Sequence, residues 1–342
     1  MRGSFHTYEV VMTSSIIPVI DITPLRQGTA QQKQHTVKAV RTACETIGFL
    51  LISGHGIAPE IIDGAFRAAF NFFDLPLADK QQAAARMRGQ QRGYAPFASK
   101  GLAATLGQEA PPDLRESFFL GPLEDHRVSY AHLPEATVAY RDNIWPVQPR
   151  DFQSHLSAYY RAMEDLAQTL MSAFATALGL SEGYFNDNID KHFSILAAHH
   201  YPVPTVAPLP GQLRTGAHTD FGSLTIIVCT DAPGGLQVQM ADGEWHDVQP
   251  GPGELIVNLG DMMARWTNNR WQSTLHRVIN PPIEQAAASR RLSLGYFMHP
   301  NYDAPIACLP GCSSPENPPA YAPTTAGRHI RDKIEASYLN RS

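Results

Sequence analysis

The sequence has few charged residues and no long apolar run, and each shortage excludes a class of protein. Of its 342 residues, 17% are charged and 43% are hydrophobic, which is enough for a sizeable core and unlike a disordered chain. No apolar stretch reaches the length of about 18 residues that could span a bilayer, so we expect no membrane partner. The net charge is −5 and Lys and Arg form no long run, which argues against a nucleic-acid partner.

Cysteine is also scarce, and its spacing points to a reducing compartment. The four cysteines show no CxxC pairing: Cys44, Cys229, Cys308 and Cys312. We expect reduced thiols in a cytoplasmic protein, with a Cys308–Cys312 disulfide as the alternative. The N-terminus lacks the apolar core of a secretory signal. Residues 1–11 look like leader sequence, and Met12 would serve equally well as the native start.

The hydrophobic period changes along the chain. Apolar residues recur at helical spacing in 31–47, after Pro59, and between Asp151 and Gly179, which predicts three helices. From about 193 to 298, short β-like runs are separated by Gly, Pro, Asn and Asp, a pattern typical of a sandwich or jelly roll. A proline-rich loop then leads into a final helix.

These patterns predict an α+β protein built as one integrated catalytic unit. A mainly helical N-terminal region, 16–192, should pack on a catalytic core, 193–300. A C-terminal loop and helix, 301–342, should complete it.

The most informative motif is His218-Thr219-Asp220, followed further along the chain by His276. Residues i and i+2 of an extended segment point the same way, so His218 and Asp220 can bind one metal ion together. Two imidazoles and one carboxylate leave three positions open on an octahedral ion, as a non-haem Fe(II) oxygenase requires. Catalytic zinc accepts the same ligands, but no HExxH-type helix is present and the ligands fall in β-rich sequence.

Further blocks surround this motif in a fixed order. They are IPVID at 17–21, GHG at 54–56, NLGD at 258–261, HRV at 276–278 and RLS at 291–293. With them, the chain resembles the isopenicillin N synthase-like family of Fe(II)/2-oxoglutarate-dependent oxygenases over about residues 16–340. The resemblance implies a double-stranded β-helix (jelly-roll) core flanked by helices, with Fe(II) held by His218, Asp220 and His276.

The resemblance also implies a site for 2-oxoglutarate. The far carboxylate of this cosubstrate needs a buried partner, and a guanidinium beside a hydroxyl suits it well. Arg291 and Ser293 face the same side of one strand and match the RxS block of the family, whereas Arg290 should face the other way. Tyr201 matches a position whose hydroxyl helps to bind the same carboxylate. His199 stands where several relatives carry asparagine.

The substrate pocket is less well marked. Phe297 lies on the same strand face as Arg291, and similar family members place a phenylalanine there beside the substrate. Arg92, Tyr94 and the segment 113–117 fall where such enzymes build pocket walls. Charged residues on both segments lead us to expect a small polar, amino-acid-like substrate.

The expected activity follows from the family resemblance. With O2 as second cosubstrate, 2-oxoglutarate is converted to succinate and CO2 while a C–H bond of a small molecule is oxidised, usually by hydroxylation. An ethylene- and succinate-forming enzyme and an oxidative cyclase or desaturase are alternatives within the family. A non-catalytic metal- or ligand-binding jelly-roll protein is the alternative from another class, and the intact triad with Arg291 and Ser293 argues against it.

Overall fold

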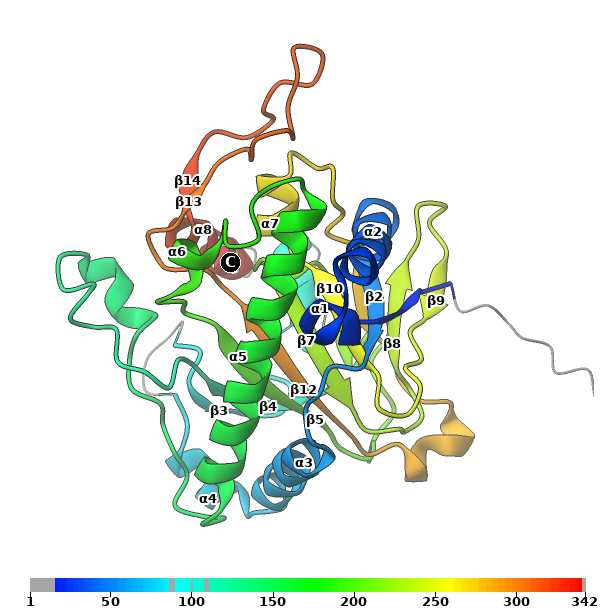
Figure 1. Cartoon of the computed structure of the whole chain (residues 1–342). Helices are drawn as coiled ribbons and strands as arrows, with labels where there is room; N and C mark the ends of the chain where they lie inside the picture. The colour runs from blue at the N-terminus through cyan, green and yellow to red at the C-terminus, as the bar shows by residue number, and fades with distance from the viewer. Residues whose placement is uncertain (1–15, 86–89, 100, 108–110, 340–342) are drawn as a thin grey trace, which may run out of the picture.

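The computed structural model describes residues 16–85, 90–99, 101–107 and 111–339 (Figure 1). The leader expected at residues 1–11 lies outside these ranges. Two β-sheets form the centre of the described chain, and helices cover the larger sheet, which is the α+β arrangement that the sequence predicts. No helix in the described ranges is long and apolar enough to cross a membrane.

The larger sheet has eight strands in the order β1-β2-β10-β7-β12-β5-β4-β3. Their bounds are β1 Val19–Asp21, β2 Phe49–Ser53, β3 Gly93–Ala95, β4 Glu116–Leu120, β5 Ile195–Tyr201, β7 Leu224–Cys229, β10 Leu255–Leu259 and β12 Arg291–Met298. All neighbours are antiparallel except β1 and β2.

The smaller sheet has four antiparallel strands in the order β6-β11-β8-β9. They are β6 Thr215–His218, β8 Leu236–Gln239, β9 Trp245–Asp247 and β11 His276–Val278. A separate pair joins β13 Pro305–Ile306 to β14 Thr324–Thr325.

The helices follow the predicted pattern. The α-helices are α1 Thr23–Gln27, α2 Ala30–Thr46, α3 Pro59–Phe73, α4 Leu77–Gln82, α5 Phe152–Ala177, α6 Asn186–Ile189, α7 Asp261–Trp266 and α8 Ala326–Leu339. Short 3-10 helices are η1 Leu102–Leu106, η2 Pro134–Val138 and η3 Ile283–Ala288. Thr29 and Gln32 form a capping box at the start of α2. Gly179 follows α5 with φ +79°, a conformation that ends helices and favours glycine.

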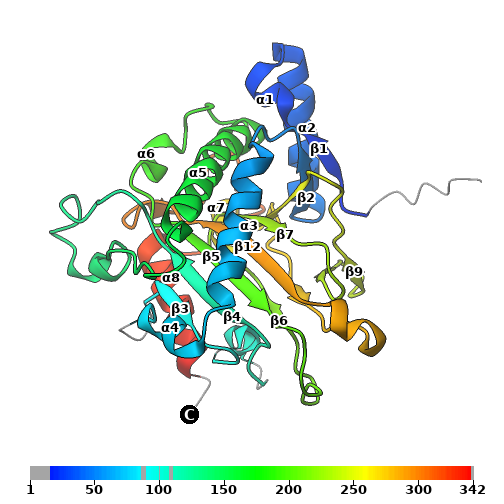
Figure 2. The same cartoon turned by 90° about the horizontal axis from the view of Figure 1, so that it is seen from below.

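Helices α3 and α5 lie side by side on one face of the larger sheet (Figures 1 and 2). On β12, Leu292, Leu294 and Tyr296 are buried toward these helices, whereas Arg291 and Phe297 line a cavity on the opposite face. Side chains alternate in this way along an extended strand. The alternation therefore divides the larger sheet into a structural face and a cavity face.

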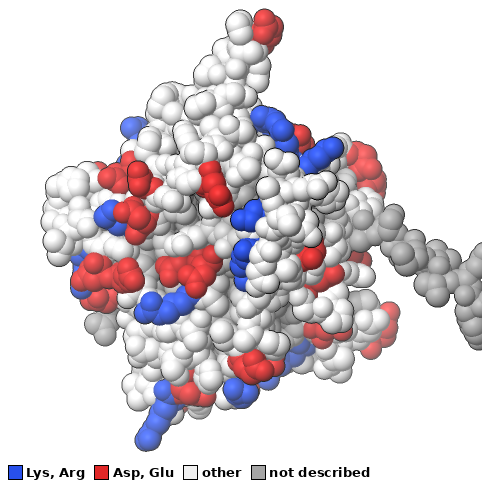
Figure 3. Space-filling view, viewed as in Figure 1, with Lys and Arg blue, Asp and Glu red and all other residues white. Residues whose placement is uncertain are grey.

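Charges are mixed on the outer surface. In the view of Figure 3, Lys and Arg side chains lie among Asp and Glu side chains and form no continuous basic band on that face.

Candidate metal and cosubstrate site

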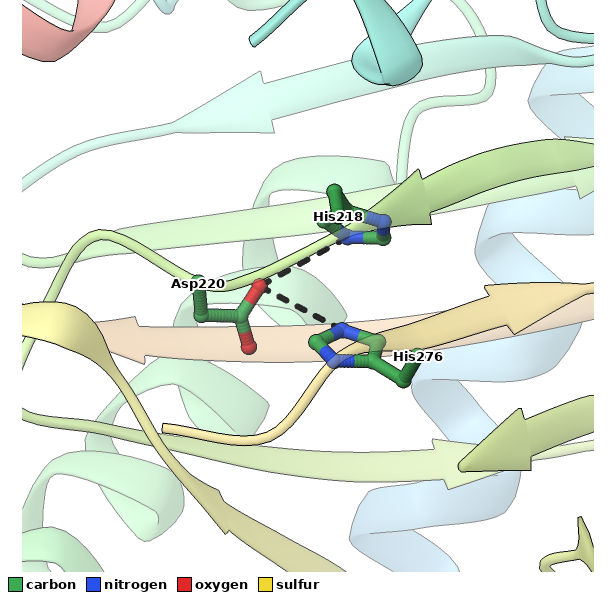
Figure 4. A group of neighbouring side chains, drawn as sticks. All are labelled: His218, Asp220 and His276. Atoms are coloured by element: carbon green, nitrogen blue, oxygen red, sulfur yellow. Dashed lines mark ion pairs between the residues drawn. The ribbon is translucent and has the colours of Figure 1, made fainter. Parts of the chain in front are cut away.

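Three buried side chains meet at one end of the cavity: His218, Asp220 and His276 (Figure 4). β6 and β11 place His276 directly opposite His218 in register, and Asp220 follows β6 by two residues. The Asp220 carboxylate Oδ1 lies 3.7 Å from His218 Nε2 and 3.6 Å from His276 Nε2. Two atoms that each lie about 2.1 Å from one ion can be at most about 4.2 Å apart, so these distances fit one shared ion.

Backbone carbonyls fix the orientation of both imidazoles. His218 Nδ1 lies 2.9 Å from the carbonyl oxygen of Gly216, and His276 Nδ1 lies 3.0 Å from that of Thr274. Each Nδ1–H donates to its carbonyl, so the lone pair of each neutral ring is on Nε2. Both Nε2 atoms face Asp220, which is the arrangement that a metal site of this type needs.

Asp220 is tied to the larger sheet through its second oxygen. Oδ2 accepts hydrogen bonds from the Thr225 hydroxyl on β7 and, at 2.7 Å, from the Asn258 amide on β10. Thr225 and Asn258 are direct partners across the β7–β10 ladder. Oδ1 therefore remains directed at the two imidazoles. The sequence analysis singled out the NLGD block that contains Asn258, but it did not predict that Asn258 or Thr225 would hydrogen-bond to Asp220.

The protonation states of His218 and Asp220 also suit a cation. Burial and then the charge of His276 lower the pKa of His218 to about 3, so its ring is neutral at neutral pH. Burial tends to raise the pKa of Asp220, but the two imidazoles and the Thr225 hydroxyl outweigh it and hold that pKa below its usual value. Burial tends to lower the pKa of His276, yet the charge of Asp220 raises it. A neutral imidazole and an ionised carboxylate are the forms that bind metal.

Asp261 stabilises the loop that carries Asp220. Its backbone N–H donates to the Asp220 carbonyl at 2.7 Å. Its carboxylate accepts hydrogen bonds from Thr219 and Ser273 and pairs with Lys333 of α8. Asp261 thus connects the metal-site loop to the segment before His276 and to the C-terminal helix.

A buried guanidinium lies in the same cavity. Arg291 donates to the Ala232 carbonyl at 3.0 Å and contacts Cys229 Sγ at 2.8 Å, and within the described ranges it pairs with no carboxylate. Arg214, also deeply buried, lies over the ring of Tyr201. Burial and also the charge of Arg291 lower the pKa of Arg214 to about 10. Arg214 lies outside the cavity lining and donates to the carbonyls of Pro233 and Ser289, so Arg291 is the buried cation here that suits a carboxylate ligand.

Residues with hydroxyl groups line the same cavity as Arg291. Tyr201 is the register partner of Arg291, and its hydroxyl lies 3.1 Å from that of Thr215. Ser293 lines the cavity with them. Arg290 points the other way, to an ion pair with Asp74 at 2.6 Å and a 2.9 Å hydrogen bond to His200. The two neighbouring arginines therefore serve opposite faces of the sheet.

The three metal-site side chains and the residues around Arg291 line one cavity of about 190 Å³. Phe297 lines it, as expected for a residue near a substrate. Arg115, from the segment 113–117 that the sequence placed among the pocket walls, also lines it, and so do His199 and Phe119, of which the sequence analysis did not name Phe119. The alternation of β4 could have revealed Arg115 and Phe119, because Ser117 between them pairs with His199 across the β4–β5 ladder.

Arg92 and Tyr94 do not line this cavity, which corrects the sequence-based expectation. The Arg92 guanidinium is buried and donates to the carbonyls of Gln91 and Ala139 at 2.8 and 2.6 Å. The Tyr94 hydroxyl donates to Glu116 at 2.6 Å, on the helix-covered side of the sheet. Both side chains satisfy buried polar groups and have no access to a ligand.

The comparisons with known proteins agree with this geometry. The family model for the 2OG-Fe(II) oxygenase superfamily matches residues 192–300, and that for the non-haem dioxygenase in morphine synthesis N-terminal matches residues 17–148. The 2-oxoglutarate-Fe(II) type oxidoreductase hxnY of Emericella nidulans is 31% identical, over 96% of this chain and 92% of the relative. The chain belongs to the 2OG-Fe(II) oxygenase superfamily.

Two further relatives of this oxygenase carry more specific names. Clavatol oxidase claD of Penicillium crustosum is 32% identical, over 95% of this chain and 97% of the relative. The crystal structure of T7H from Neurospora crassa with alpha-KG and thymine has a TM-score of 0.81 and 30% identity, covering 94% of this chain and 97% of that one.

The family assignment confirms the expected reaction class. The protein is a non-haem iron, 2-oxoglutarate-dependent dioxygenase with a double-stranded β-helix core, and it uses Fe(II), 2-oxoglutarate and O2. The zinc hydrolase and the non-catalytic binder are thereby set aside.

The placement of Tyr94 in a structural network generates a stability prediction. Glu116 accepts from Tyr94, pairs with Lys80 at 2.8 Å and contacts His200 Nδ1 at 2.8 Å. Glu116→Gln should lower the free energy of unfolding by about 3–5 kcal/mol near neutral pH, because Lys80 would be left buried without its counter-charge. Chemical denaturation measures this loss.

The pH dependence of that loss has a definite sign. Burial raises the pKa of Glu116, but the hydrogen bonds from His200, Lys80 and Tyr94 outweigh it, so the pKa lies below its usual 4.5. A depressed carboxyl pKa gives stability that is present above pH 4.5 and is lost as the pH falls further. The difference in the free energy of unfolding between wild type and Glu116→Gln should therefore become smaller as the pH falls below 4.5. Glu244→Gln, at an exposed position, is the control and should show no such difference. A difference in the free energy of unfolding that grows below pH 4.5 would contradict the assignment of Glu116 as the ionised partner of Lys80.

Proposed function

We propose that this oxygenase oxidises a C–H bond of a small molecule inside the cavity between its two sheets. His218, Asp220 and His276 would hold Fe(II). Arg291, Ser293 and Tyr201 would bind the far carboxylate of 2-oxoglutarate. The observation that carries the proposal is that both sets of side chains face one cavity, the first from the smaller sheet and the loop after β6, and the second from the larger sheet.

The products follow from the balance of the reaction. One molecule of 2-oxoglutarate, one O2 and one C–H bond give succinate, CO2 and a hydroxylated product, with one oxygen atom in each organic product. Bound Fe(II) supplies the redox chemistry of O2 activation. We propose hydroxylation as the outcome, because it is the reaction in which the second oxygen atom stays in the product; desaturation or ring closure would release that atom as water.

The protein's own residues would orient the ligands and exclude water. Thr225 and Asn258 keep Asp220 Oδ1 directed at the metal position. Arg291 contacts Cys229, which packs against the apolar cluster that includes the cavity-lining residues Ile227, Leu236, Ile256 and Val278. A dry wall strengthens the interaction between a guanidinium and a carboxylate.

A small polar substrate is favoured by the relatives and by the cavity wall. The relatives include an oxidase named for clavatol and a protein crystallised with thymine. In this chain, Gln91 and Arg115 add polar groups to a wall that Phe119 and Phe297 make partly aromatic. We also propose a cytoplasmic location, which the four free cysteines support.

The metal assignment predicts that His276→Ala loses both iron and activity. The change removes one of three protein ligands, and succinate release should fall by more than about 100-fold, since residues that only hydrogen-bond to a metal ligand already contribute about 10- to 100-fold. Iron per chain is measured by metal analysis after desalting. His35→Ala, exposed on α2, is the matched control and should keep both. Full activity of His276→Ala without added imidazole would refute the assignment.

The cosubstrate assignment is tested by two neighbouring arginines. Arg291→Met should raise the Kd for 2-oxoglutarate by at least about 100-fold, because the far carboxylate would be buried without a partner. Iron binding should be retained. Arg290→Met is the matched control, since its guanidinium lies on the other face and pairs with Asp74. Calorimetric titration of 2-oxoglutarate without O2 measures both. Equal effects of the two changes would place the cosubstrate elsewhere.

Phe297 should affect the substrate and not the cosubstrate. Phe297→Ala would open the wall beside the substrate and admit water, so 2-oxoglutarate would be consumed with less product per succinate. The ratio of product to succinate, measured for the wild type and the variant, should fall in the variant. An unchanged ratio, or a loss of affinity for 2-oxoglutarate alone, would show that the substrate binds on another wall.

A further inference from the structure

Arg115 brings to the cavity a positive charge that neither proposed site uses. Among the described residues that line the cavity, the Asp, Glu, Lys and Arg side chains are Asp220, Arg291 and Arg115. Asp220 is assigned to the metal and Arg291 to the cosubstrate. Arg115 is therefore the remaining fixed charge available to a substrate.

Asp113, which does not itself line the cavity, holds one edge of the Arg115 guanidinium in place. Arg115 Nη2 lies 3.2 Å from Asp113 Oδ2, and both side chains are largely buried. Asp113 is itself fixed by the backbone N–H groups of Gly216 and Leu102, at 3.0 and 3.3 Å. Gly216 precedes His218 on β6, so Arg115 is anchored to the strand that carries a metal ligand. A guanidinium has five N–H donors in a planar fork, and one contact with Asp113 leaves donors for a ligand.

The wall around Arg115 is aromatic and uncharged. Ser117 and Phe119 share its side of β4, and Glu116 points to the opposite face. The His199 ring lies 5.9 Å from the Phe119 ring and 6.5 Å from the Phe297 ring, and its Nδ1 lies 2.7 Å from the Ser117 hydroxyl. Burial, with the charge of Arg115, keeps the pKa of His199 well below its usual value, so the ring is neutral.

We propose that the substrate is a small monoanionic acid whose carboxylate binds Arg115 and whose apolar or aromatic body lies between Phe119 and Phe297. This inference rests on the proposed function, because it assigns Asp220 and Arg291 to the metal and the cosubstrate. It narrows the expected polar substrate and departs from an amino-acid-like one. A free ammonium group would need a carboxylate partner, and the described cavity wall offers Asp220 alone.

Matched probes of different charge test the inference. Phenylacetate, phenylacetamide and 2-phenylethylammonium share a phenyl body and carry charges of −1, 0 and +1. Each is titrated by calorimetry into the full chain with Fe(II) and saturating 2-oxoglutarate, without O2, so that the Arg291 site is already filled. The acid should bind about 10- to 100-fold more tightly than the amide, as one charge-assisted hydrogen bond allows, and the ammonium should bind more weakly still.

Variants of Arg115 test whether this residue causes the preference for the acid over the amide. Arg115→Met should remove the preference for the acid over the amide, whereas Arg115→Lys should keep part of it because the charge remains. Arg277→Met is the control, since Arg277 stacks on Trp245 outside the cavity lining and should leave the preference intact. If Arg115→Met does not fold, the probe series with wild type and Arg115→Lys decides the question.

Several outcomes would overturn the inference. They are equal binding of acid and amide by the wild type, no binding of any probe, and an acid preference that survives Arg115→Met. A loss of 2-oxoglutarate affinity in Arg115→Met as large as that in Arg291→Met would assign Arg115 to the cosubstrate instead. Failure of the proposed function would look different, because 2-oxoglutarate would then not bind to the iron-loaded wild type at all.

Discussion

The carboxylate of Asp220 joins the two sheets, and the rest of the site depends on how it is held. One of its oxygens accepts hydrogen bonds from Thr225 and Asn258 of the larger sheet, and the other faces two imidazoles of the smaller sheet. A buried carboxylate is unfavourable unless all its oxygens are satisfied. These contacts keep it ionised without metal and aim one oxygen at a cation. The register of β7 with β10 and that of β6 with β11 must both be correct for this to occur.

The helices on the larger sheet determine which side chains can act chemically. Because α3 and α5 cover one face, alternate residues of each strand belong to a packed interior and the others to the cavity. Adjacent charged residues consequently have unrelated roles. Arg291 faces the cavity, whereas Arg290 pairs with Asp74 on the helix side. In the same way, Arg115 faces the cavity, whereas the next residue, Glu116, faces the helices and pairs with Lys80. A shift of one residue in either strand would exchange these roles, so register controls chemistry here as much as residue type does.

Much of this arrangement was predictable from the sequence because the signals are local. The spacing of His218 and Asp220 needs only an extended backbone, and the long apolar stripe of α5 needs only helical periodicity. The ordered motifs then identified His276 and Arg291. The roles of Arg92 and Tyr94 were not predictable in this way, because the partner of Tyr94 lies on a neighbouring strand and that of Arg92 lies in a distant loop. Asn258 was missed for the same reason: its contact depends on the pairing of distant strands.

Arg291 is a buried positive charge in the cavity that the described fold does not neutralise. It donates to one carbonyl and contacts one sulfur, and it has no carboxylate partner in the described chain, whereas nearby Arg214 lies outside the cavity lining and donates to the carbonyls of Pro233 and Ser289. The burial of Arg291 should become favourable once a dicarboxylate brings the missing charge. Binding of 2-oxoglutarate should thus stabilise the native state in addition to supplying electrons. The choice of arginine over lysine fits the same view, since a planar fork can bind a carboxylate through two hydrogen bonds and remain charged when dry.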